Sequence, residues 1–304
     1  MSLLPATPAA RLLGQTGISV SPIAWGMWRL ADNGRSSSDA TRLVHTALDA
    51  GINLLDTADI YGFNGSGGFG DAEALLGQVL AAEPALRERM VLATKGGIRP
   101  PLPYDQSPAY LAEAIDASLA RLRVDTIDLW QVHRPDILAH PQEVARALED
   151  ASAAGKIRAL GVSNFTVGQI DALAAFLGQP LASTQPEISP LRIDCFENGE
   201  LDQAMRLRLT PLAWSPLGGG RLLSPESARD RAVGAELDRI AAEQEVSRSV
   251  AAYGWLMAHP AGIIPIIGSQ SAERITEGAR AMSMRWTRQD WYAVLVAARG
   301  EKLP

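Results

Sequence analysis

The chain alternates short apolar runs with longer amphipathic segments over most of its length. The run Ile127–His133 is typical, because it is mostly apolar and is followed by Pro141–Ala154, in which apolar side chains recur every three or four positions. Apolar runs without strict alternation predict parallel strands with covered outer faces, and the amphipathic spacing predicts the helices that cover them. The chain is therefore predicted to consist of strand–helix units.

Eight strands can be traced in this way, most of them followed by a helix. The predicted strands are Ile23–Gly26, Asn53–Ala58, Met90–Lys95, Ile127–His133, Ala159–Ser163, Leu181–Gln185, Leu212–Ser215 and Ile263–Ile267. The predicted helices are Ser38–Ala50, Asp71–Ala82, Pro108–Arg121, Pro141–Ala154, Val167–Leu177, Leu201–Leu207, Val233–Glu245, Ser249–Ala258 and Ala272–Met282. Eight such units favour closure into a (β/α)8 barrel, the TIM-barrel fold.

Two shorter features flank these units. An N-terminal hairpin is expected from Arg11–Leu13 and Ile18–Val20, and an extra C-terminal helix is expected at Arg288–Arg299. No linker rich in proline, glycine or serine divides the chain. Residues 1–304 are therefore interpreted as a single barrel domain, a length that such barrels often reach.

Composition narrows the possible partners. The chain has 304 residues, 47% of them hydrophobic, and a formal net charge of −6. A net acidic chain is a poor match for nucleic acid. Cys195 is the only cysteine, so no intrachain disulfide can form, and no segment has the pattern of a signal peptide or a membrane span. These features predict a cytoplasmic protein with neither a nucleic-acid nor a membrane partner.

Four polar residues follow or close predicted strands. Asp56 lies at the end of the second predicted strand and Tyr61 follows that strand. Lys95 is the last residue of the third predicted strand, and His133 is the last residue of the fourth. Each has an ordinary structural use when taken alone, such as a turn former or a side chain that extends to solvent. The carboxyl ends of all strands of such a barrel surround one mouth, where active sites lie. Together the four residues therefore indicate a catalytic site.

Six strings of the sequence resemble successive motifs of the aldo-keto reductases. They are DTADIYG (Asp56–Gly62), VLATKGG (Val91–Gly97), IDLWQVHRPD (Ile127–Asp136), GVSNF (Gly161–Phe165), AWSPLGGGRL (Ala213–Leu222) and IPIIGSQSAERI (Ile264–Ile275). They occur in family order and cover most of the chain, which is most similar to bacterial-type members with short loops. The resemblance implies an enzyme that reduces aldehydes or ketones with NAD(P)H, and a catalytic tetrad at Asp56, Tyr61, Lys95 and His133.

The chemistry of carbonyl reduction fits these residue types. A carbonyl that accepts a hydride develops negative charge on its oxygen, so a proton donor must lie beside it. Tyr61 can be that donor if the nearby ammonium of Lys95 lowers its pKa from the ordinary value of about 10. Asp56 can hold Lys95 in place, and His133 can orient the carbonyl. The hydride itself comes from the cofactor.

The resemblance also implies which residues contact the cofactor. Ser163, Asn164 and Gln185 match positions that hydrogen-bond the nicotinamide, and Trp214 matches the aromatic residue against its face. The full set of expected contacts is Gly26, Met27, Asp56, Ser163, Asn164, Gln185, Trp214, Ser215, Leu217, Gly219, Gly220, Arg221, Gly268, Ser269, Gln270, Arg274 and Glu277. Trp28, Tyr61 and His133 are expected to line the pocket for a small carbonyl substrate.

The preferred cofactor is predicted from the last motif. Arg274 follows the last strand near a predicted helix start, where it can pair with the 2′-phosphate of NADPH. Gln270 and Gly278 replace residues that relatives use near the adenosine, so NADH remains a possible cofactor. No metal is expected, because the histidines and Cys195 show no ligand spacing.

Two alternatives need consideration. Gly65–Gly70 matches the G-x-G-x-x-G pattern of dinucleotide-binding folds, but it does not leave its strand directly and the next strand ends in Lys95 instead of an acidic residue. A loop at the barrel mouth is the preferred interpretation. The other alternative is a cofactor-binding sensor on the same fold, similar to potassium-channel β subunits, which keep the tetrad. The sequence leaves open the natural substrate and whether the protein is a monomer or a small homo-oligomer.

Overall fold

The computed structural model describes residues 2–303, in which eight parallel strands close into a barrel. The strands are β3 (Ala24–Gly26), β4 (Leu54–Asp56), β5 (Val91–Gly96), β6 (Ile127–Val132), β7 (Ile157–Ser163), β8 (Ser183–Gln185), β9 (Thr210–Ala213) and β10 (Ile264–Ile267). They pair in chain order, and β10 closes the barrel against β3. The predicted (β/α)8 barrel is confirmed.

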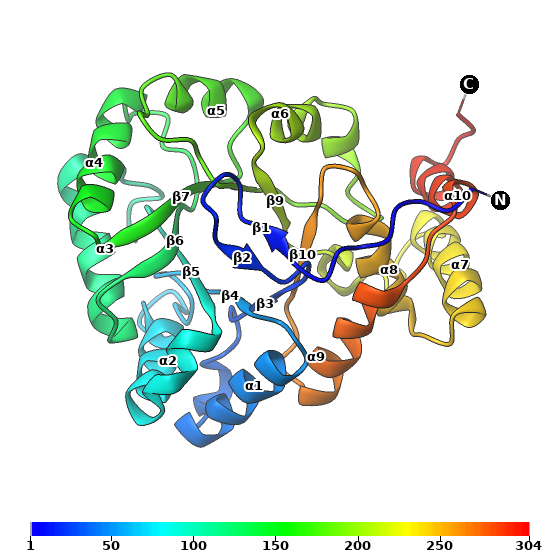
Figure 1. Cartoon of the computed structure of the whole chain (residues 1–304), viewed down its shortest axis with the longest axis horizontal. Coiled ribbons are helices and arrows are strands. Elements are labelled where there is room, and N and C mark those ends of the chain that lie inside the picture. The colour runs from blue at the N-terminus through cyan, green and yellow to red at the C-terminus, as the bar shows by residue number, and fades with distance from the viewer. Residues whose placement is uncertain (1, 304) are drawn as a thin grey trace.

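Helices form a ring outside the strands (Figure 1). They are α1 (Ser37–Asp49), α2 (Asp71–Ala82), α3 (Pro108–Leu122), α4 (Pro141–Ala153), α5 (Val167–Ala174), α6 (Glu200–Leu207), α7 (Ala228–Glu243), α8 (Arg248–Met257), α9 (Ala272–Ala279) and α10 (Arg288–Arg299). Many begin at a serine or threonine whose side chain accepts a backbone N–H of the first turn, as Ser227 does for α7 and Ser271 for α9. No helix within residues 2–303 is long and apolar enough to cross a membrane.

The N-terminal hairpin covers one end of the barrel. Its strands β1 (Arg11–Leu12) and β2 (Ser19–Val20) are antiparallel, and Figure 1 shows them in front of the barrel strands. The hairpin backbone is tied to the starts of β4 and β9, since Gly14 N donates to Thr210 Oγ1 (2.8 Å) and Asn53 Nδ2 donates to the Ser19 carbonyl (3.1 Å). The predicted hairpin is thus confirmed, and it leaves the carboxyl ends of the strands as the accessible end.

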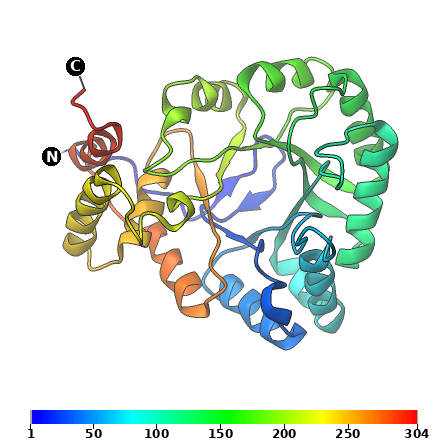
Figure 2. The same cartoon turned by 180° about the vertical axis from the view of Figure 1, so that it is seen from behind.

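The appended helix α10 packs against α7 beside the barrel (Figures 1 and 2). Trp291 of α10 stacks on Trp255 of α8, with ring centroids 5.0 Å apart, and each indole N–H donates to the backbone carbonyl of the other residue at 3.0 Å. Both buried indole donors are therefore paired, and a large apolar area is removed from water. This contact holds the C-terminal helix on the barrel.

Some predicted boundaries were wrong. β9 ends at Ala213 instead of Ser215, because Ser215 has a left-handed backbone (φ 49°) that turns the chain out of the sheet. α7 begins at Ala228 instead of Val233, since Ser227 provides the cap. The earlier end of β9 places Trp214 and Ser215 in the loop at the barrel mouth.

Candidate active site

The ends of three neighbouring strands bring Asp56, Lys95 and His133 to the same mouth. β4 pairs with β5, and β5 pairs with β6, so the carboxyl ends of the three strands lie side by side. Lys95 Nζ donates to Asp56 Oδ2 at 2.6 Å and to the Thr57 carbonyl at 2.8 Å. Lys95 is fully buried, so its charge is balanced by the carboxylate and not by water.

Tyr61 completes the cluster from the loop that follows β4. The Lys95 ammonium lies 5.1 Å from the centre of the Tyr61 ring, and the rings of Tyr61 and His133 meet edge to face with centroids 5.9 Å apart. Tyr61 remains partly exposed, whereas Asp56 and Lys95 are buried beneath the mouth. The structure therefore brings together all four residues that the sequence placed at strand ends.

The surroundings shift the pKa values of three of these groups. Burial raises the pKa of Tyr61 above its ordinary value, and the charge of Lys95 only opposes that rise, so the net lowering expected from the sequence is not found. Burial alone would lower the pKa of Lys95, but Asp56 and Tyr61 outweigh it and the pKa is raised. Burial, together with the charges of Lys95 and Arg134, holds the pKa of His133 well below its ordinary value. At neutral pH the site thus holds protonated Tyr61, charged Lys95 and neutral His133.

Asp56 is held by two glutamines as well as by Lys95. Gln185 Nε2 and Gln131 Nε2 donate to Asp56 Oδ1 at 3.0 and 3.3 Å. Gln131 was missed in the sequence analysis, although it lies two positions before His133 on β6. Residues at i and i+2 of a strand face the same side, which is the signal that could have found it. The carboxylate is thus fixed from three directions.

The side chains expected at the nicotinamide form a chain of hydrogen bonds. Trp214 Nε1 donates to Asn164 Oδ1 (3.0 Å), and Asn164 Nδ2 donates to the His133 carbonyl (3.2 Å) and to Ser163 Oγ (2.8 Å). Asn164 has a left-handed backbone (φ 60°), which asparagine tolerates better than most residues. These residues therefore support one another, and they tie the end of β9 to the ends of β6 and β7.

The glycine-rich segment after β9 has the geometry of a loop that a ligand can approach closely. Gly218, Gly219 and Gly220 all have left-handed φ angles, and a Cβ atom at Gly219 or Gly220 would meet no other atom within 4 Å. Leu217 is partly buried against the core. Arg221, expected to be a cofactor contact, donates from Nε to the buried Asp230 at 3.0 Å. In this structure Arg221 anchors the loop to α7.

The residues expected at the adenosine surround the start of α9. Ser271 caps this helix, and Arg274 in its first turn is exposed. The Ser269 carbonyl accepts the indole N–H of Trp25 at 3.0 Å, and Gln270 Nε2 donates to the Gly26 carbonyl at 2.9 Å. Gly268 and Glu277 lie on either side of these residues, in the loop after β10 and in α9.

The donor set of this mouth fits a nicotinamide dinucleotide. An aromatic ring and amides lie at one side, an open glycine loop follows, and a helix N-terminus with a nearby cation lies at the far side.

Two further residues expected at the site differ in their exposure. Trp28 is exposed at 61%, whereas the side chain of Met27 is fully buried in the core, so only the Met27 backbone can contact a ligand.

Two further features considered from the sequence are the glycine pattern Gly65–Gly70 and the possibility of a metal site. Gly65–Gly70 lies in the loop between Tyr61 and α2, next to a barrel strand, so it is not the turn of a doubly wound sheet. No group of three or more His, Cys, Asp or Glu side chains within residues 2–303 is arranged as a metal site.

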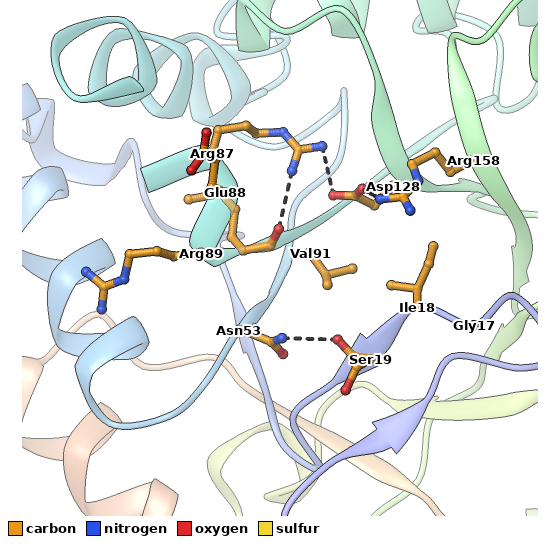
Figure 3. Close-up of a pocket in the computed structure, with 11 residues that line it drawn as sticks. Gly17, Ile18, Ser19, Asn53, Arg87, Glu88, Arg89, Val91, Asp128 and Arg158 are labelled. Carbon is orange, nitrogen blue, oxygen red and sulfur yellow. Dashed lines mark hydrogen bonds and ion pairs between the residues drawn. The ribbon is translucent and has the colours of Figure 1, made fainter. Parts of the chain in front are cut away.

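Figure 3 shows a pocket of about 390 Å³ at the opposite end of the barrel. It is lined by residues that precede or begin strands, among them Asn53 and Val91. Its arginines are paired, since Arg87 and Arg158 both contact the buried Asp128 at 2.8 Å. The strand starts of such barrels serve stability. We therefore interpret the ion pairs of this pocket as contacts that stabilise the fold, and we take the opposite end of the barrel as the candidate active site.

Comparison with known proteins identifies a family of similar sequences and a solved structure with a similar fold. Residues 22–295 match the model of the aldo/keto reductase family. The chain is 77% identical over 304 residues, all of both chains, to a 6-dehydroglucose reductase of Novosphingobium aromaticivorans. It is 36% identical to a 6-dehydroglucose reductase of Agrobacterium fabrum over 94% of this chain and 97% of that one. The crystal structure of a thermostable aldo-keto reductase superposes with a TM-score of 0.82 at 22% identity, covering 95% of this chain and 99% of the other.

Proposed function

The chain belongs to the aldo/keto reductase family, and we propose that it reduces 6-dehydroglucose to glucose with NADPH as the hydride donor. Identity of 77% over the full length of a reductase named for this substrate supports the substrate. A 6-dehydroglucose carries an aldehyde at C6, outside the sugar ring. Its reduction adds a hydride to C6 and a proton to the oxygen, and yields a primary alcohol.

The residues of the mouth supply what the oxygen needs. When bound, the reduced nicotinamide supplies the hydride to the aldehyde carbon. Tyr61 donates its proton to the oxygen as negative charge develops there, and the Lys95 ammonium stabilises the phenolate that remains. Neutral His133 donates a hydrogen bond that orients the carbonyl. Asp56 keeps Lys95 charged and in place.

The observation that carries this chemistry is the buried Lys95–Asp56 ion pair directly beneath Tyr61. Removing an ammonium and a carboxylate from water costs free energy unless the two groups pair closely and make further hydrogen bonds. Lys95 and Asp56 are both buried and form such a close pair. A charged group 5.1 Å from a tyrosine ring, with a neutral histidine on the other side, is the arrangement that general acid catalysis of carbonyl reduction needs.

The preference for NADPH is proposed from the start of α9. The free N–H groups of its first turn favour an anion, and Ser269 and Ser271 add hydroxyl groups nearby. The exposed guanidinium of Arg274, which makes no ion pair within residues 2–303, is available to the 2′-phosphate. NADH lacks this phosphate and would leave the guanidinium without its partner.

The direct test of this proposal is a steady-state assay that follows oxidation of the reduced cofactor by its absorbance. We expect turnover of 6-dehydroglucose with a kcat/KM at least about tenfold above that for propanal, and a lower KM for NADPH than for NADH. Absence of turnover with 6-dehydroglucose and with a panel of other carbonyls would contradict the proposal. It would favour the cofactor-binding sensor instead.

A further inference from the structure

Arg134 is the residue directly after His133, and hydrogen bonds to Gln106 fix the backbone around it. Its carbonyl accepts a hydrogen bond from Gln106 Nε2, and the backbone N–H of Gln106 donates to the Asp136 carboxylate at 3.2 Å. Gln106 is itself buried, in the segment that leads into α3. The chain around Arg134 is thus anchored to a neighbouring loop, and the direction of this strand end is fixed.

The side chain of Arg134 lies inside the mouth. Its guanidinium carbon is 5.8 Å from the centre of the Trp214 ring, and its charge is one of the causes that lower the pKa of His133, after burial and Lys95. It therefore lies near both the residue expected to orient the carbonyl and the aromatic ring expected at the nicotinamide. The residue is partly buried.

The guanidinium of Arg134 makes no hydrogen bond or ion pair within residues 2–303. The other partly buried arginines of this part of the chain have such partners. Arg121 pairs with Glu73 at 2.7 Å, Arg87 pairs with Asp128 at 2.8 Å, and Arg35 donates to the Leu30 carbonyl at 2.9 Å. A guanidinium has five donors in a planar fork. None of the Arg134 nitrogens is among the fully buried polar atoms without a partner within residues 2–303, so water reaches the fork. A bound molecule with paired acceptors can take the place of that water.

We infer that Arg134 recognises hydroxyl groups of the substrate and sets the preference of this enzyme for hydroxylated aldehydes over plain ones. The inference rests on the proposed function, and it extends that function by naming the residue that distinguishes a sugar from other aldehydes. With the aldehyde at Tyr61 and His133, the rest of the substrate extends towards the rim. Adjacent hydroxyl oxygens of a sugar ring are spaced to accept the two parallel N–H groups of the fork.

Two pairs of substrates isolate this interaction. Tetrahydropyran-2-carbaldehyde has the same six-membered ring and external aldehyde as 6-dehydroglucose but no hydroxyl groups, and propanal has the same relation to glyceraldehyde. We expect Arg134→Gln to lower kcat/KM for 6-dehydroglucose about 10- to 100-fold, mainly through KM, as for loss of hydrogen bonds from a charged donor. The kcat/KM for tetrahydropyran-2-carbaldehyde should change less than about twofold. Arg134→Lys, which keeps the charge but not the fork, should restore only part of the loss.

Arg29→Gln is the matched control, because Arg29 is also stacked on a tryptophan at this end of the barrel, 4.9 Å from the Trp28 ring, but is exposed. This substitution removes the same charge, and we expect it to leave the ratio of kcat/KM values between the two substrates of each pair unchanged. The affinity for NADPH, measured by quenching of tryptophan fluorescence, should stay within about twofold in both variants.

The outcomes separate this inference from the proposed function. A wild type that prefers 6-dehydroglucose, with Arg134→Gln keeping that preference, overturns the inference alone. A wild type that does not turn over 6-dehydroglucose but prefers glyceraldehyde over propanal, with that preference lost in Arg134→Gln, overturns only the proposed substrate. Equal losses for hydroxylated and plain aldehydes, or a weakened affinity for NADPH, would show that Arg134 acts on the cofactor or the catalytic cluster and would overturn the inference.

Discussion

Tyr61 lies between a charged neighbour, Lys95, and a neutral one, His133, and its hydroxyl is the proposed acid. Tyr61→Phe removes only the hydroxyl and keeps the ring contacts with both. We expect kcat to fall by about 10²- to 10⁴-fold, the range for loss of a general acid, while the affinity for NADPH is almost unchanged. Single-turnover kinetics and a cofactor titration measure the two effects separately. A variant with nearly normal kcat for several aldehydes would show that another group supplies the proton.

Lys95 is expected to act through the pKa of Tyr61. Its ammonium opposes the burial that raises this pKa, so Lys95→Met should raise the pKa further. Reduction needs the protonated phenol and is lost as pH rises through the pKa, so the alkaline limb of the kcat profile should move upward while kcat falls. The ionisable groups that face Tyr61 are Lys95, Asp56, His133 and Asp59. An unchanged alkaline limb with robust activity would contradict the coupling.

A control is needed because Lys95→Met leaves Asp56 buried without its counter-ion. Breaking a buried pair on one side costs about 3–5 kcal/mol, so the single variant should melt at a lower temperature than the wild type. Adding Asp56→Asn removes both charges. The double variant is expected to recover much of the stability and none of the activity, which separates the catalytic effect from a folding defect.

The sequence was sufficient to bring Asp56, Tyr61, Lys95 and His133 together, because barrel strands converge at their carboxyl ends. It was not sufficient for residues whose role depends on a partner far along the chain. The bond from Arg221 to Asp230 is one example, and the expected contact of Arg221 with the cofactor stays a prediction. Neither the lack of a partner for Arg134 nor the bond from Gln131 to Asp56 could be seen before the strands were placed.

At the scale of elements, α9 tests the choice of cofactor. The Arg274 side chain is exposed in the first turn of this helix, whose N-terminus favours phosphate. We expect Arg274→Ala to weaken NADPH binding about 10- to 100-fold and to change NADH binding less than about twofold. Arg288→Ala in the first turn of α10 is the matched control. Equal affinities of the wild type for the two cofactors would exclude the proposed role.

The boundaries of elements were predicted well where local signals were strong. α2 and α10 have the bounds that the periodicity predicted, and the hairpin lies where its two short runs lie. The end of β9 was wrong because a left-handed serine is not a recognisable stop signal. The start of α7 was wrong because the apolar spacing begins later than the cap at Ser227, and the first turn of the helix is mostly exposed.

At the scale of the whole molecule, the interpretation of residues 1–304 as one domain remains a prediction. The strands share one closed sheet, the hairpin covers its base, and α10 is joined to α8 through two tryptophans. Calorimetry should therefore show one unfolding transition with equal calorimetric and van't Hoff enthalpies. NADPH at 100 times its Kd should stabilise the whole chain by about 2.7 kcal/mol. Two separate transitions, with only one shifted by NADPH, would indicate independent units.

The most direct test of the account follows the hydride itself. NADPH deuterated at both C4 positions of the nicotinamide is incubated with 6-dehydroglucose and the enzyme, and the glucose formed is examined by NMR and mass spectrometry. We predict one deuterium per glucose, located at C6, and no labelled glucose above background with Tyr61→Phe over the same time. Unlabelled glucose, label at another carbon, or equal labelling by the wild type and Tyr61→Phe would contradict the proposed reduction at this site.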